Sequence, residues 1–137
     1  MNLLRLIHYP PIDGSEEDGA VRAAPHGDIN LLTILPSSTE PGLQLLSSNN
    51  EWIDGPFRKD YIIVNVGDML QECSNHYYKS TIHRVINPEG IDASKPRLSL
   101  PLFLHPRNEV QLSERYLAEE YRQERYRELG LADKETY

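Results

Sequence analysis

Two separate segments of the sequence carry side chains that could bind one metal ion. His26 and Asp28 stand two residues apart, and on an extended segment this spacing places both side chains on one face. An imidazole and a carboxylate can then reach the same ion, and His83 on a later strand could supply a third ligand. Two histidines and one carboxylate that leave coordination positions open are the ligand set of non-haem iron(II) sites.

The pattern His-x-Asp is a weak signal when it is taken alone. Histidines and carboxylates are more often surface groups or hydrogen-bonding partners than metal ligands. The other histidines, His8, His76 and His105, have no carboxylate two residues further on. We therefore expect structural or solvent-exposed roles for them.

Arg97 and Ser99 repeat the same alternation near the end of the strand-rich part of the chain. A planar guanidinium beside a hydroxyl is well suited to bind a carboxylate. Their strand would return past the metal, where an organic acid that chelates the metal would place its far end. The alternative is that Arg97 forms a salt bridge between neighbouring strands.

A scaffold of short strands must position these side chains. Up to Pro106, apolar runs of Leu, Ile and Val alternate with Pro, Gly, Ser and Asn, which predicts strands. The predicted strands are Leu3–Tyr9, Asn30–Leu35, Leu43–Leu46, Tyr61–Val66, His83–Ile86 and Leu98–Leu104. The acidic, turn-rich stretch 10–19 predicts an exposed loop.

Two helices are expected outside these strands. Gly67–Asn75 predicts a short helix with Asp68 as its N-cap, and we expect Cys73 in it to be a small buried residue. Ser113–Gly130 predicts one long C-terminal helix that ends at its glycine. Because no helix long enough for a crossover separates the strands, a sandwich or jelly roll is favoured over a parallel sheet.

The composition describes one acidic globular domain. The chain has 137 residues, 14 Lys and Arg against 21 Asp and Glu, and a net charge of −7. Without a cluster of basic residues, this charge argues against nucleic acid and against membranes as partners. A single cysteine forms no internal disulfide, and the first residues lack the long apolar stretch of a signal peptide. We therefore expect a cytoplasmic protein.

The order and spacing of several short motifs resemble the C-terminal catalytic domain of the isopenicillin N synthase-like 2-oxoglutarate/Fe(II)-dependent dioxygenases. The motifs are His26-Gly27-Asp28, Leu32-Thr33, Pro41-Gly42-Leu43-Gln44, Val64-Asn65-Val66-Gly67-Asp68, Ser74-Asn75, Tyr78-Lys79-Ser80-Thr81, His83-Arg84-Val85 and Arg97-Leu98-Ser99. No single motif is specific, but their number and order are. The resemblance covers residues 3 to 106.

This resemblance implies a mainly β protein with a double-stranded β-helix (jelly-roll) core. It implies that His26, Asp28 and His83 hold Fe(II), and that Arg97 and Ser99 bind the distal carboxylate of the co-substrate 2-oxoglutarate. In similar plant proteins an Asn-x-Tyr before a proline helps to bind that co-substrate near its metal-chelating end. Tyr9 matches that tyrosine, whereas Ile7 stands in place of the asparagine.

The resemblance also implies a division of the chain into two parts and the lack of the family's N-terminal region. We expect a dioxygenase jelly-roll domain in residues 1–106 and a C-terminal helical extension in residues 107–137. Members of the family carry a long N-terminal region ahead of the segment that begins here, and we expect this chain to lack it. The uncovered sheet would then favour self-association.

The leading hypothesis is an oxygenase that uses Fe(II), 2-oxoglutarate and O₂. It would oxidise a C–H bond of a small organic substrate and release succinate and CO₂. One alternative is an oxidase of the same family that does not consume 2-oxoglutarate. Another is an inactive jelly-roll binding module or a truncated fragment.

Overall fold

The computed structural model describes residues 2–17 and 19–131. These residues form short strands, two α-helices and one turn of 3-10 helix. The strands are β1 (Leu3–Leu4), β2 (Ile7–Tyr9), β3 (Ala23–His26), β4 (Leu32–Pro36), β5 (Leu43–Leu46), β6 (Trp52–Asp54), β7 (Ile62–Val66), β8 (His83–Val85), β9 (Arg97–Ser99) and β10 (Leu102–Leu104). The helices are α1 (Asp68–Cys73) and α2 (Ala118–Glu128), and the 3-10 turn is Gly90–Ser94.

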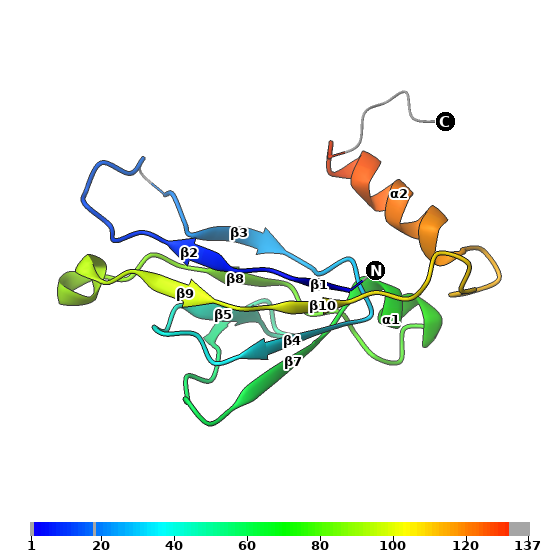
Figure 1. Ribbon diagram of the computed structural model, residues 1–137, viewed down its shortest axis with the longest axis horizontal. Helices are drawn as coiled ribbons and strands as arrows, with labels where there is room; N and C mark the ends of the chain where they lie inside the picture. Colours follow the sequence, from blue (N-terminus) through cyan, green and yellow to red (C-terminus); the bar gives the residue numbers. More distant parts are fainter. Residues whose placement is uncertain (1, 18, 132–137) are drawn as a thin grey trace.

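The strands form antiparallel sheets in the arrangement of a jelly roll. One sheet has the order β1-β10-β4-β7, a second has the order β3-β8-β5-β6, and β2 pairs with β9. Figure 1 shows α1 and α2 at one end of the strands and the 3-10 turn at the opposite end. The predicted mainly β jelly-roll fold is confirmed.

Two predicted strands are each divided into two. The expected strand Leu3–Tyr9 is β1 followed by β2, and the expected strand Leu98–Leu104 is β9 followed by β10. Pro101 lies at the second break, where it has no N–H to donate to a neighbouring strand. Its carbonyl still accepts a hydrogen bond from the Arg5 N–H at 3.0 Å. This bond joins the two segments of the chain at the point where both strands are broken.

Two strands of the second sheet have no counterpart among the predicted strands. β3 contains Pro25, which weakens the sequence signal for a strand. β6 is the return strand of a hairpin in which Leu46 lies opposite Trp52. Asn50 turns this hairpin with a φ of 60°. Of the two, β3 matters directly for the site, because it carries His26 into the sheet.

The short helix α1 differs in two details from the prediction. Asp68 is its first residue and makes no cap, whereas Gly67 is the N-cap. Cys73 is exposed, so the prediction of a buried cysteine is wrong. α1 buries Met69 instead, which is 1% exposed.

The C-terminal helix begins later than predicted. Residues 112–116 form a tight turn, in which the Leu112 N–H donates to the Tyr116 carbonyl at 2.9 Å. Gln111 and Leu117 form a β-bridge across this turn, so α2 begins at Ala118 rather than at Ser113. The helix ends at Glu128, two residues before the predicted end at Gly130, whose φ is +68°.

α2 packs on α1 through a small hydrophobic cluster. Met69, Leu112 and Ala118 are its buried members, and Tyr121 packs against them. Burial raises the pKa of Tyr121 to about 12, and the nearby Asp68 carboxylate acts in the same direction.

Across the described ranges, the structure has no helix that is both long and apolar enough to cross a membrane.

Candidate active site

The three predicted metal ligands come together between the two sheets. His26 ends β3 and lies opposite His83, the first residue of β8, in the antiparallel register. Asp28 follows two residues after His26 in the loop toward β4. One ligand atom from each of the three side chains lies within 4.8 Å of the others, and the two imidazole rings are 4.4 Å apart.

Backbone carbonyls orient both imidazoles. Nδ1 of His26 lies 2.7 Å from the Ala24 carbonyl oxygen, and Nδ1 of His83 lies 3.1 Å from the Thr81 carbonyl oxygen. A carbonyl oxygen only accepts hydrogen bonds, so each Nδ1 carries the proton. In the neutral form of each ring the lone pair is then on Nε2, which is the nitrogen left free to bind a metal.

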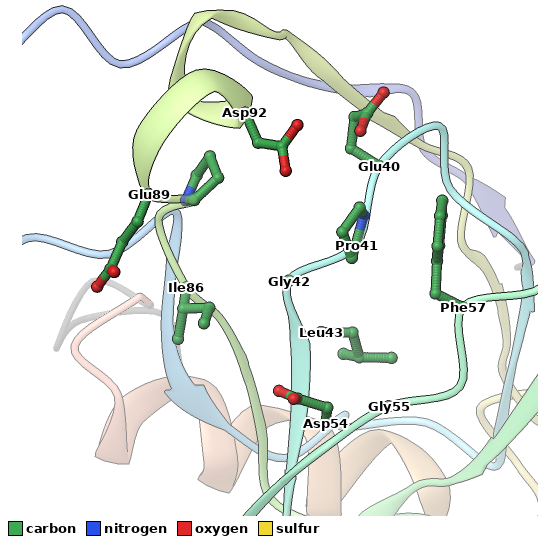
Figure 2. A pocket seen from close by; sticks show the side chains of 11 residues that line it. Glu40, Pro41, Gly42, Leu43, Asp54, Gly55, Phe57, Ile86, Glu89 and Asp92 are labelled. Atoms are coloured by element: carbon green, nitrogen blue, oxygen red, sulfur yellow. The ribbon is translucent and has the colours of Figure 1, made fainter.

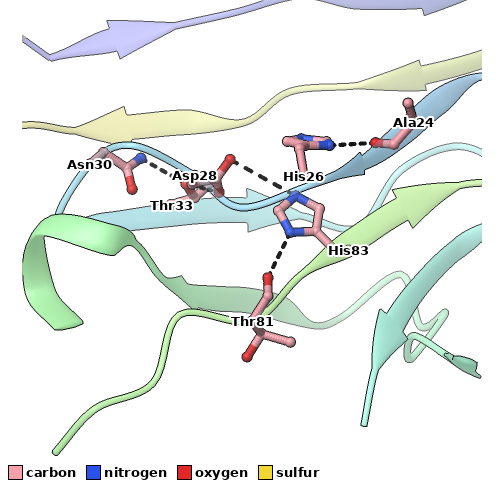
Figure 3. Close-up of polar contacts among 7 residues, drawn as sticks. All are labelled: Ala24, His26, Asp28, Asn30, Thr33, Thr81 and His83. Carbon is pink, nitrogen blue, oxygen red and sulfur yellow. Dashed lines mark hydrogen bonds and ion pairs between the residues drawn. The ribbon is translucent and has the colours of Figure 1, made fainter. Parts of the chain in front are cut away.

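Two buried polar side chains hold the Asp28 carboxylate. The Thr33 hydroxyl donates to Oδ2 of Asp28 at 2.5 Å, and the Asn30 side-chain amide donates to the Thr33 hydroxyl oxygen at 2.8 Å. The other carboxylate oxygen, Oδ1, lies 3.9 Å from Nε2 of His83. Figure 3 shows this chain of contacts beside the two histidines.

The loop that carries Asp28 is attached to the start of α1. The Asp68 N–H donates to the Asp28 carbonyl at 2.8 Å, and the Met69 N–H donates to the Asn30 carbonyl at 3.0 Å. Gly67 approaches so closely that a Cβ on it would lie 2.2 Å from Asn30 oxygens. A φ of −95° suits any residue, so the backbone conformation does not require a glycine at this position. The close approach of Asn30 does.

Arg97 and Ser99 line the same cavity as the metal ligands. Arg97 is 2% exposed and Ser99 is 6% exposed. Nε of Arg97 donates to the carbonyls of Glu40 and Pro41 at 3.0 and 3.1 Å, whereas its buried Nη1 has no hydrogen-bond partner among the described residues. Within the described ranges no carboxylate forms an ion pair with this guanidinium, so the alternative of a cross-strand salt bridge is not observed.

Tyr9 lies at the guanidinium end of this cavity. It is opposite Arg97 in the β2–β9 register, and the guanidinium carbon is 5.4 Å from the centre of its ring. Burial lowers the pKa of Arg97, the Tyr9 hydroxyl opposes this change, and the Arg22 charge adds to it. An arginine stays protonated in proteins, so the cavity offers a buried cation with an open hydrogen-bonding position.

All six predicted site residues line one cavity of about 70 Å³. They are Tyr9, His26, Asp28, His83, Arg97 and Ser99. Apolar side chains such as Leu35, Val85 and Phe103 form the rest of the wall. The arrangement can hold a metal at one group of residues and a carboxylate at another, inside a largely apolar chamber.

A separate cavity of about 410 Å³ contains none of these six residues. Figure 2 shows the carboxylates of Glu40 and Asp92 on one side of its opening and Asp54 on the other, around Leu43 and Ile86. It is larger than the metal cavity, but among the described residues that line it no group could hold a metal together. Size alone therefore does not identify the candidate site.

Sequence reasoning missed the residues that support Asp28. Asn30 and Thr33 are 1% and 2% exposed. The available signal was a threonine at an inward position between apolar residues of β4.

Of the remaining histidines, His8 and His76 are exposed as expected, whereas burial lowers the pKa of His105.

Comparisons with known proteins point in one direction. The sequence profile of the 2OG-Fe(II) oxygenase superfamily matches residues 1–106. Gibberellin 2-beta-dioxygenase 7 of Arabidopsis thaliana is 38% identical over 128 residues, which are 93% of this chain and 36% of that protein. This chain therefore spans about a third of the length of that relative.

Solved structures give the same picture. A Shewanella oneidensis protein provisionally described as an oxygenase is 59% identical, with a TM-score of 0.84 over 96% of this chain and 48% of that one. A full-length Neurospora crassa protein in complex with alpha-KG is 31% identical, with a TM-score of 0.81 over 93% of this chain and 44% of that one. The Neurospora protein has also been solved with both alpha-KG and thymine.

The close approach at Gly67 leads to a stability prediction. Gly67→Ala places a methyl group against Asn30 backbone and side-chain oxygens, so we expect it to lower the free energy of unfolding by about 1–3 kcal/mol or more. Urea unfolding measures this loss. Gly27→Ala is the control, because the atoms nearest to its added Cβ belong to side chains at 3.1 Å or more. Equal stability of the two variants would contradict the packing described here.

Proposed function

The chain belongs to the 2OG-Fe(II) oxygenase superfamily, and from this premise we propose that it carries the metal and co-substrate site of an Fe(II)- and 2-oxoglutarate-dependent oxygenase. The observation that carries the proposal is the convergence of His26, Asp28 and His83 within 4.8 Å. The family needs Fe(II), 2-oxoglutarate and O₂. The activity of the whole protein is part of the proposal, because the chain spans 36% to 48% of the relatives described above.

The donor set suits Fe(II). Two neutral imidazoles and one carboxylate are the ligands of non-haem iron(II) sites that keep positions open. We assign Nε2 of His26, Nε2 of His83 and Oδ1 of Asp28 as the ligand atoms, since Nδ1 of each ring and Oδ2 of the carboxylate are already bonded. Fe(II) held there would supply the chelation of 2-oxoglutarate and the reduction of O₂.

The unpartnered Nη1 group of Arg97 supports 2-oxoglutarate as the co-substrate. The Nη1 group of Arg97 is buried without a hydrogen-bond partner in the described part of the chain, and a buried polar group in that state is costly unless a ligand satisfies it. A dicarboxylate with a keto group beside one carboxylate could bind the metal at that end and Arg97 with Ser99 at the other. Tyr9, beside the guanidinium, would border the same ligand.

The proposed reaction couples two oxidations. 2-Oxoglutarate loses CO₂ and becomes succinate with one oxygen atom of O₂. The second oxygen atom oxidises a C–H bond of a small organic substrate and ends in the hydroxylated product or, if the substrate is desaturated or cyclised, in water. The chain itself binds and orients the co-substrate and excludes water through the apolar wall of the cavity. The alternative is an oxidase of the same family that does not consume 2-oxoglutarate, and absence of succinate on turnover would identify it.

We make further proposals about the location, the substrate class and the domain organisation of the protein. We propose a small-molecule substrate, as the relative solved with alpha-KG and thymine suggests. We also propose a cytoplasmic location, because the single cysteine forms no internal disulfide. We propose a division into a jelly-roll domain of residues 1–106 and a C-terminal extension of residues 107–137. The extension would brace the domain through the contact of α2 with α1.

The metal assignment predicts a loss of Fe(II) binding. Replacing His26, Asp28 or His83 with Ala removes one of the ligands, so we expect tight Fe(II) binding to be lost while the fold persists. Anaerobic equilibrium dialysis with Fe(II) measures the affinity, and circular dichroism checks the fold. His76→Ala is the control because that imidazole is exposed. Undiminished Fe(II) affinity in His83→Ala would refute the assignment.

The carboxylate assignment predicts a specific loss of 2-oxoglutarate affinity. Arg97→Lys keeps a charge but loses the planar fork, and Arg97→Ala loses both. The missing charge-assisted hydrogen bond is worth about 1.5–3 kcal/mol, or roughly ten- to a hundredfold in affinity. Anaerobic titration of the Fe(II)-loaded protein with 2-oxoglutarate, followed by the visible charge-transfer band, measures it.

A matched control lies on a strand of another sheet. Arg84→Lys makes the same replacement on β8, where the Arg84 side chain bonds Gln44 and stacks on Trp52. We expect this variant to keep the 2-oxoglutarate affinity of the wild type. An Arg97→Ala protein with unchanged affinity would return Arg97 to a structural role.

We also propose that the outer face of the first sheet binds a second copy of the chain. Leu4, Leu102, Ile34 and Val64 lie opposite one another across all four strands, and we call them the outer row. Val64 and Leu4 are each 58% exposed, and β7 is the edge strand that carries Val64. An exposed apolar row beside an open strand edge promotes association.

The outer row predicts a dimer or a larger assembly that a charge would weaken. Size-exclusion chromatography with light scattering on the wild type measures the mass as a function of concentration. We expect Val64→Lys to shift the protein toward monomer, because a buried lysine in the interface would be desolvated. Ile53→Lys places the same charge on an exposed residue of the other sheet, and it should not. A wild type that stays monomeric would contradict the proposal.

A further inference from the structure

We propose that Thr33 is a positioning residue that turns a single oxygen of Asp28 toward the metal. The inference rests on the proposed function, since it concerns how the carboxylate is presented to Fe(II). Thr33 bonds the carboxylate and is not itself one of the proposed ligands. Its role would be to decide which oxygen is available and how firmly that oxygen is held.

The direction of the hydrogen bonds makes Thr33 a donor to Asp28. The Asn30 amide nitrogen donates to the Thr33 hydroxyl oxygen at 2.8 Å. A hydroxyl that accepts this bond still has its own proton to give, and it gives that proton to Oδ2 of Asp28 at 2.5 Å. Asn30 thereby orients Thr33, and Thr33 orients the carboxylate.

Burial makes this arrangement hard to replace. Asn30, Thr33 and Asp28 are 1%, 2% and 7% exposed, so bulk water has little access to the carboxylate. If the hydroxyl were absent, Oδ2 would lose its hydrogen bond and the carboxylate could rotate. A buried carboxylate that loses a donor is penalised more heavily than an exposed one.

The arrangement has a consequence for coordination. Oδ1 is the oxygen on the side of the histidines, 3.9 Å from Nε2 of His83 (Figure 3). A carboxylate that binds a metal through both oxygens occupies one more coordination position than a carboxylate that binds through one. By keeping Oδ2 engaged, Thr33 leaves that position for the co-substrate or O₂.

The test compares variants that remove or keep the hydroxyl. Thr33→Val removes the hydroxyl and keeps the shape, and Thr33→Ser keeps the hydroxyl and removes a methyl group. Isothermal titration calorimetry with Mn(II), a metal that does not oxidise in air during the measurement, gives the affinity without any turnover. We expect Thr33→Val to bind Mn(II) roughly 10- to 100-fold more weakly than the wild type, and Thr33→Ser to restore the affinity to within a few-fold.

Controls separate positioning from folding. Thr39→Val removes a hydroxyl that accepts a hydrogen bond from the Leu98 N–H at 2.9 Å, away from the carboxylate, and it should bind Mn(II) as the wild type does. Thermal melting of each metal-free protein shows whether the variant is folded. If Thr33→Val does not fold, Thr33→Ala removes the same hydroxyl without adding a second methyl group, and the same loss of affinity is expected.

The outcomes distinguish this inference from the proposed function. A wild-type protein that binds no Mn(II) would overturn both. A wild type that binds Mn(II), together with a folded Thr33→Val or Thr33→Ala protein of equal affinity, would overturn the positioning role alone. In that case Thr33 would be a structural residue of the buried core.

Discussion

The pleat of antiparallel strands is the constraint on which the candidate site depends. Successive side chains of a strand point to opposite faces, so His83 faces the cavity while its neighbour Arg84 bonds Gln44 outside it. Register then brings groups from distant parts of the chain together, with Tyr9 opposite Arg97. A slip of one residue in this pair would turn a binding group to the opposite face.

Groups that do not themselves ligate set the direction of the proposed ligands. Two backbone carbonyls fix the proton on Nδ1 of each imidazole, and Thr33 bonds one oxygen of Asp28. The same loop is attached to α1 through backbone hydrogen bonds at Asp68 and Met69. α2 packs on α1 in turn, so the geometry of the site is supported by a helix that contributes no ligand.

Sequence reasoning could predict the features that depend on local pattern. Alternation and motif order predicted the jelly roll, and they placed His26 and Arg97 in positions that the structure brings into one cavity. The break within Leu98–Leu104 was missed although Pro101 is a local signal against a continuous strand. The matching break within Leu3–Tyr9 has no such signal and lies where the Arg5 N–H bonds the Pro101 carbonyl. The role of Thr33 was missed because a side-chain contact with Asp28 follows from the fold and leaves little trace in spacing.

The three proposed ligands differ in their contact with solvent. Asp28 and His83 are 7% and 8% exposed, whereas His26 is exposed. An ion at this site would have one accessible flank, so loading and exchange would need no separation of the paired strands. Chelators would compete for the ion through this flank, and the rate of metal loss would follow the dissociation of ligand bonds rather than the opening of the protein.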